Sequence, residues 1–116
     1  MSFLRARNRG SRARERGKGV TGYVLSRRAE SDLDEIWDYS AERWGREQAN
    51  RYLGALRESI ERVALDPSRG RSLSVRGRSY HQYRSGSHMI FYREMDRGIQ
   101  IVRVLHQSMN YAQHLR

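Results

Sequence analysis

The spacing of apolar and polar residues along the chain predicts a first strand, two helices and then further strands. A short run rich in β-forming residues, 21–25, predicts a first strand. Apolar residues then recur at helical spacing in two successive segments. We expect Ser26 to cap the first helix and Gly45 to end it, and we expect Pro67 to end the second helix. The two stripes are Leu33, Ile36, Trp37, Ser40 and Trp44, then Ala49, Tyr52, Leu53, Leu56, Ile60, Val63 and Ala64. The short link at Gly45 predicts an antiparallel helical hairpin.

The second half of the chain has the pattern of hairpins. Residues 67–79, PSRGRSLSVRGRS, have the composition of a basic loop. Three strand-like runs follow at 79–85, 88–95 and 99–106, separated by short turns that contain glycine, and residues 109–116 form either a short helix or a loose tail. The predicted fold class is α+β, in the order β-α-α-β-β-β, with the helical hairpin packed on a small, mainly antiparallel sheet.

Charge divides the chain into a tail and a body. The net charge of the 116 residues is +10, but residues 1–22 hold seven basic residues against Glu15 alone, a net of +6. We therefore predict a basic, disordered tail at 1–19 and one folded domain at 20–116. The tail has two interpretations: a basic arm that contacts a partner, or a start codon assigned upstream of the true one, near Val20.

Composition narrows the classes of function. The chain has no cysteine and four scattered histidines, so we expect neither a disulfide framework, nor a metal site, nor a cofactor. Apolar runs stay well short of the roughly 20 residues that cross a membrane. We expect a cytoplasmic protein without a membrane partner.

Four phrases of the sequence resemble the RelE/ParE superfamily of toxins, and most closely its ParE branch. They are LSRRAESDLDEIWDYSAERWG (25–45), QANRYLGALRESIERVALDPSRGR (48–71), YRSGSHMIFYRE (83–94) and IVRVLHQSMNYAQHL (101–115). The resemblance implies a toxin of a type II toxin–antitoxin system, neutralised by a cognate antitoxin of the ribbon-helix-helix type. It also implies one of two targets. ParE-like toxins are associated with DNA gyrase, whereas RelE-like toxins cut mRNA on the ribosome.

The residues favour the first target. Cutting RNA without a metal needs a base, an acid and cations that stabilise the phosphorane. RelE-like toxins carry lysines before the central turn and an arginine just after it. This chain has no lysine on that strand, and His88 occupies the position after the turn. A toxin that acts by binding gyrase, and meets nucleic acid only indirectly, is therefore the main hypothesis, with the question of enzymatic activity open.

Two sets of residues are candidates for the site. The alternative, an mRNA endonuclease with a degenerate site, would use His81, His88, His106 and Tyr111. Strand pairing about the 96–98 turn places His88 opposite the stretch around His106, so the two histidines as neighbours also fit a structural cross-strand pair. For partner or target binding we expect Arg84, Arg93, Arg103 and His106, with the three arginines forming a basic groove if they share the sheet face away from the helices. We expect Trp37 and Trp44 to anchor the first helix.

Overall fold

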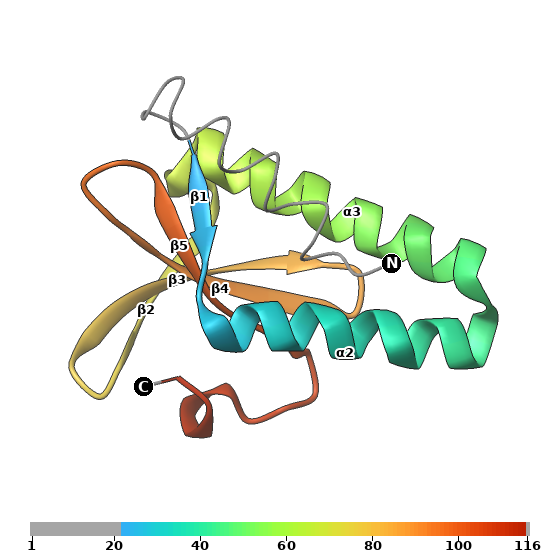
Figure 1. The fold of residues 1–116 in the computed structure, drawn as a ribbon. Coiled ribbons are helices and arrows are strands. Elements are labelled where there is room, and N and C mark those ends of the chain that lie inside the picture. The colour runs from blue at the N-terminus through green and yellow to red at the C-terminus, as the bar shows by residue number, and fades with distance from the viewer. Residues whose placement is uncertain (1–21, 116) are drawn as a thin grey trace.

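The structure is a computed structural model that describes residues 22–115 (Figure 1). The prediction for residues 1–19 lies outside the described residues, as does Thr21. In chain order the elements are β1 (Tyr23–Leu25), α2 (Arg27–Trp44), α3 (Arg46–Leu65), η1 (Pro67–Arg69), β2 (Arg71–Val75), β3 (Arg78–Ser85), β4 (His88–Glu94), β5 (Ile99–His106) and η2 (Tyr111–Gln113). The α+β class, the helical hairpin and the meander are confirmed.

The two helices begin and end where the sequence predicts. Ser26 caps α2 by accepting a hydrogen bond from the N–H of Ala29, and its hydroxyl also donates to Val102 O of β5. Gly45, with φ of 94°, ends α2 and lets α3 start at the next residue. Asp66 ends α3 immediately before Pro67. The helices form one layer, and the sheet forms the other (Figure 1).

The five strands have the order β1-β5-β4-β3-β2, in which β1 is parallel to β5 and the other neighbours are antiparallel. The ladder between β4 and β5 contains a bulge, because Phe91 pairs with Arg103 and Tyr92 with Ile101, leaving Val102 as the extra residue. The bulge shifts the alternation of β5. Ile99 and Ile101 face the helices before it, and Val104 faces them after it.

The interpretation of residues 67–79 as a loop was wrong for residues 71–75. They form strand β2, which pairs with β3 through a two-residue turn at Arg76-Gly77. Both turn residues have positive φ, 55° and 79°, as a type I′ hairpin requires. The strand was missed because it lies at the sheet edge with only Leu73 and Val75 packed, so arginine and serine dominate its composition.

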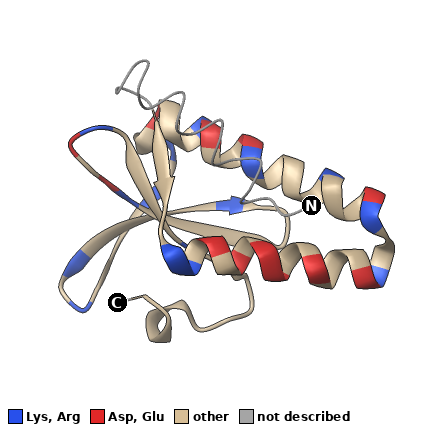
Figure 2. Cartoon of the chain, viewed as in Figure 1, with Lys and Arg blue, Asp and Glu red and all other residues tan. Residues whose placement is uncertain are grey.

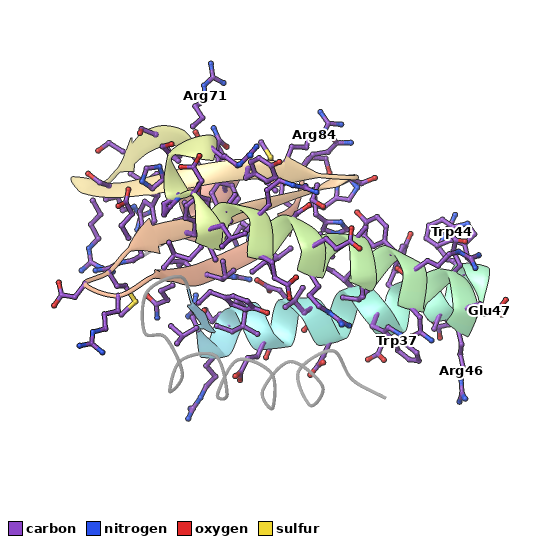
Figure 3. All side chains as sticks on the ribbon, turned by 90° about the horizontal axis from the view of Figure 1, so that it is seen from above. Trp37, Trp44, Arg46, Glu47, Arg71 and Arg84 are labelled. Atoms are coloured by element: carbon purple, nitrogen blue, oxygen red, sulfur yellow. The ribbon has the colours of Figure 1, made fainter. Side chains whose placement is uncertain are left out.

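The sheet has an apolar core on each face. On the helix side, the helices pack on Ile90, Tyr92 and Val104 among others. On the far side, Val75, Tyr80, Phe91 and Leu105 form a smaller core that Leu115 and Ala112 of the C-terminal segment cover. Trp37 packs against the helix-side core and donates to Asn50 Oδ1 at 2.9 Å, as an anchor should. Trp44 is 60% exposed, because the hairpin tip extends beyond the sheet (Figure 3).

Candidate functional site

A groove of about 710 Å³ runs between α2, the start of α3 and the ends of β4 and β5. We call it the helix groove. One wall of the groove consists of Ile36, Tyr39, Ser40 and Trp44 of α2. The end of the groove away from Trp44 is lined by Tyr52, His88, His106 and Met109. Asp32, Glu35 and Arg103 line it near the middle of the sheet edge. The groove thus combines large apolar side chains with a pair of histidines.

The outer part of the helix groove exposes aromatic side chains. Tyr39 is 56% exposed and Trp44 60%, and their rings meet edge to face with centroids 6.2 Å apart. The guanidinium of Arg43 lies 5.5 Å from the Tyr39 ring centroid and 5.4 Å from that of Trp44. An exposed apolar cluster of this kind, with one cation held against it, is typical of a surface that a partner protein covers.

His88 and His106 lie side by side at the other end of the groove, as the sequence predicts. They are directly paired in the β4–β5 ladder, with ring centroids 5.4 Å apart. The bulge in β5 makes this possible, because it turns His106 to the same side of the sheet as His88. The N–H of Ser108 donates to His106 Nδ1 at 3.1 Å, so the neutral His106 ring carries its hydrogen on Nε2.

Tyr52 of α3 holds His88 in place. Its hydroxyl lies 2.6 Å from His88 Nδ1 and accepts a hydrogen bond from the N–H of Ser87 at 3.0 Å. Gly86 is required in this turn for two reasons. Its φ is 61°, and a Cβ there would meet the Tyr52 ring at 2.8 Å. The turn between β3 and β4 is therefore fitted to the helix that crosses it.

His88 is neutral at physiological pH. Burial, together with repulsion from a charge on His106, lowers the pKa of His88 to about 4, and the Asp32 carboxylate opposes this shift. A neutral imidazole cannot supply the permanent positive charge that the RNA-cutting relatives carry after the central turn. The structure thus strengthens the argument made from the residue type alone.

Because its pKa is lowered, His88 should destabilise the protein as pH falls from about 6.5 to about 4. The unfolded chain takes up this proton near pH 6.5 and the folded chain only near pH 4, so the unfolded state binds more protons in this window. The full difference in pKa corresponds to a loss of ~3 kcal/mol in the free energy of unfolding. Partial exposure of the ring reduces the expected loss to ~1–2 kcal/mol.

Denaturant titrations at the two ends of this window measure the effect. His88→Gln should lose less stability than the parent on acidification, by ~1–2 kcal/mol. His114→Gln, which removes a histidine outside the groove, is the control for the loss of a histidine side chain. Equal pH dependence of His88→Gln and the parent would show that His88 is not the titrating group.

The other two members of the predicted catalytic set lie elsewhere. His81 stacks on Tyr92, and its Nε2 is 3.1 Å from a carboxylate oxygen of Glu94. Tyr111 packs on Phe91 on the far side of the sheet, with ring centroids 5.3 Å apart. The four residues therefore do not converge on one site, and only His88 and His106 share the helix groove.

Arg103 is held in an ion pair, which separates it from the other two predicted arginines. Its Nε and a terminal nitrogen each donate to a different carboxylate oxygen of Asp32 at 2.8 Å, and it also donates to His114 O at 3.3 Å. This pairing raises the pKa of Arg103 above its ordinary value. Arg84 and Arg93 are exposed and lie on the sheet face away from the helices. The expected groove of three arginines does not form.

Asp32 and Tyr52 were missed by the sequence reasoning. Asp32 is buried, and its Oδ2 also accepts a hydrogen bond from the N–H of Val104 at 2.9 Å. A signal existed, because Asp32 stands three residues after Ala29 and one before Leu33, both of which face the core. A carboxylate at a core-facing helical position indicates a buried partner. For Tyr52, membership of the apolar stripe concealed the role of its hydroxyl.

Among residues 22–115, no group of three or more His, Cys, Asp and Glu side chains is arranged to hold a metal ion. Neither α2 nor α3, the two long helices of the described chain, is long and apolar enough to cross a membrane. The helix groove itself offers apolar contact, hydrogen bonding by Tyr52, His88 and His106, and the carboxylate of Glu35 beside the Asp32–Arg103 ion pair.

The fold is shared with a chain of known structure. A chain from a solved structure titled "Chromosomal ParDE TA system from P. aeruginosa" superposes with a TM-score of 0.67 and 22% identity, over 77% of this chain and 98% of that one. This likeness shows that the two chains have the same fold.

Sequence comparison identifies the family within that class. Residues 23–111 match the family described as "ParE toxin of type II toxin-antitoxin system, parDE". The "Toxin ParE1" of Caulobacter vibrioides is 50% identical over 93 residues, covering 80% of this chain and 96% of that protein. The "Toxin ParE1" of Mycobacterium tuberculosis H37Rv is 43% identical over 94 residues, with the same coverage. The chain therefore belongs to the ParE toxin family and, as part of a ParDE system, has an antitoxin as its partner.

Proposed function

We propose that this ParE toxin acts by binding and inhibiting DNA gyrase, without cleaving a substrate. The observation that carries this proposal is the state of the cations in the helix groove. Arg103 is neutralised by Asp32, and His88 is neutral, so neither can stabilise a developing phosphorane. Gyrase is the target associated with the ParE branch that the sequence resembles.

The helix groove supports a second part of the proposal, which is neutralisation by a ribbon-helix-helix antitoxin. Tyr39, Trp44 and Met109 line the groove and are exposed large apolar residues. An amphipathic helix placed in such a groove buries its apolar face against them. A helix bound there would shield the exposed apolar cluster of α2 from water.

Two assays run side by side test the proposed target. The purified toxin should inhibit supercoiling by purified gyrase, and it should leave protein synthesis in a cell-free translation extract unchanged. The antitoxin complex at the same concentration is the matched control, and it should inhibit neither reaction. Inhibition of translation with no effect on gyrase would contradict the proposal.

A second candidate function, mRNA cleavage, is favoured by one observation, the adjacency of His88 and His106. A histidine-based nuclease would leave 2′,3′-cyclic phosphate ends, and His88→Ala or His106→Ala would slow cutting by at least ~100-fold. We expect no such RNA ends in the translation extract. Both variants should poison gyrase as the parent does.

A further inference from the structure

We propose that the sheet face away from the helices is a DNA-binding surface that contacts the phosphate backbone through four arginines. We call it the arginine face, and its cations are Arg71, Arg78, Arg84 and Arg93. From the sequence, nucleic acid was expected to meet this protein only indirectly. The surface lies opposite the helix groove, so a DNA contact there leaves the groove free for another partner.

Strand register places the four arginines on one face. Arg71 lies on β2 two residues from Leu73, Arg78 lies on β3 two residues from Tyr80, and both Leu73 and Tyr80 pack in the far-side core. The same alternation places Arg84 with Tyr80 on β3, and Arg93 with Phe91 on β4. Figure 3 shows Arg71 and Arg84 projecting from the sheet on the side opposite α2.

The arginines form two neighbouring pairs. Arg71 pairs with Gln82, so Arg84 is its diagonal neighbour on the same face. Arg78 and Arg93 line a common hollow at the other end of the face, together with Ser79, His81 and Glu94 of the helix side. Diagonal neighbours in a sheet have Cα atoms about 7–8 Å apart, which is within reach of long side chains. The face can therefore present two pairs of guanidinium groups to a run of phosphates.

Acidic residues are missing from this face within the described strands. The strands contain a single acidic residue, Glu94, which bonds His81 on the helix side. In the described chain, all four arginines are exposed and none forms an ion pair with a carboxylate. Figure 2 shows the same separation of charge, with basic positions on the β2–β3 hairpin and the acidic ones concentrated on α2.

A nucleic acid fits this face better than an acidic protein segment does. Protein interfaces need a well-packed apolar centre. Here the apolar centre is already covered by Leu115 and Ala112 of the C-terminal segment. Phosphate binding needs cations and counterion release, and no free apolar area. That the bound DNA is DNA held by gyrase rests on the proposed function, whereas the proposal that this face binds DNA does not.

Fluorescence anisotropy of a short labelled DNA duplex tests the proposal on the full chain. Arg71→Gln/Arg84→Gln should bind roughly 10- to 100-fold more weakly at about 0.1 M salt, and the slope of log K against log salt should be shallower by about 1.8. Arg51→Gln/Arg62→Gln is the matched control, because it removes the same charge from exposed positions of α3 on the opposite side. Residues 1–21 are identical in all three proteins, so their contribution cancels. Thermal unfolding checks that the variants are folded.

Three results separate the possible outcomes. Weaker binding and a shallower slope for the arginine-face variant alone support the proposal. Equal losses in both double variants overturn it, because they reflect net charge only. Unchanged DNA binding with weakened affinity for the antitoxin also overturns it, and assigns the face to the antitoxin. If the parent fails to inhibit gyrase, the proposed target is wrong, and the anisotropy still decides whether the face binds DNA.

Discussion

Replacing Asp32 by alanine should lower the free energy of unfolding by about 3–5 kcal/mol, the largest loss of stability that we expect from one substitution outside the apolar core. Asp32 is 8% exposed and accepts three hydrogen bonds, two from Arg103 and one from the N–H of Val104. Alanine would leave the half-buried guanidinium and a buried N–H without these partners, which is costly for both.

The position of Asp32 in the sheet explains why its loss should be severe. β1 pairs with β5 only at residues 99–101, so the edge of β5 is free from Val102 onward. Ser26 and Asp32, both at the start of α2, supply the polar partners for that edge at Val102 and Val104. The ion pair therefore fixes α2 to the sheet at the point where the helix groove begins.

Chemical denaturation of Asp32→Ala and of Asp38→Ala measures this effect. Asp38 is exposed on the same helix, so its substitution should change the free energy of unfolding by less than ~0.5 kcal/mol. Asp32→Leu/Arg103→Met removes both charges and should recover part of the loss. An Asp32→Ala variant as stable as Asp38→Ala would show that the ion pair contributes little.

The second large effect should appear in antitoxin binding. Substitution of both Tyr39 and Trp44 by alanine should weaken the affinity for the cognate antitoxin by at least ~30-fold, equivalent to ~2 kcal/mol or more. These rings are large, exposed and held against each other and against Arg43, so they lose little conformational freedom when a partner covers them. Their exposure also means that the variant should stay folded.

Isothermal titration of the antitoxin provides the measurement. Leu65→Ala is the matched control, because Leu65 is 68% exposed at the other end of the helical hairpin and does not line the groove. It should bind the antitoxin as the parent does. A change of less than about 3-fold for Tyr39→Ala/Trp44→Ala would place the antitoxin outside the helix groove, since central aromatic contacts normally cost more than this.

The regular elements could be predicted because their signals are local. Ser26, Gly45 and Pro67 set the bounds of the helices, and glycine-containing turns separate β3, β4 and β5. Strand β2 was missed because its Arg76-Gly77 turn lacks the Asn-Gly or Asp-Gly signature, and because only one of its faces packs. The exposure of Trp44 depends on how far the hairpin extends beyond the sheet, which helical periodicity does not report.

The candidate site could be predicted only where strand register carries the information. Counting residues about the 96–98 turn places His88 opposite the stretch around His106, and the bulge at Val102, which the counting does not include, sets their direct pairing. The partner of Arg103 is Asp32, 71 residues away in sequence, and the bond between Tyr52 and His88 joins a helix to a turn. Such contacts depend on how the layers pack, so spacing within one segment does not reveal them.

The central claim is that this ParE toxin is a gyrase inhibitor that acts by binding, and trapping of cleaved DNA tests it most directly. Purified gyrase, plasmid and rising concentrations of toxin are combined, and the linear DNA linked to gyrase is measured with and without the antitoxin. We predict that the toxin raises the trapped fraction, that His88→Ala and His106→Ala do so as well, and that the antitoxin abolishes the effect. A trapped fraction that does not change with the toxin concentration would contradict the claim.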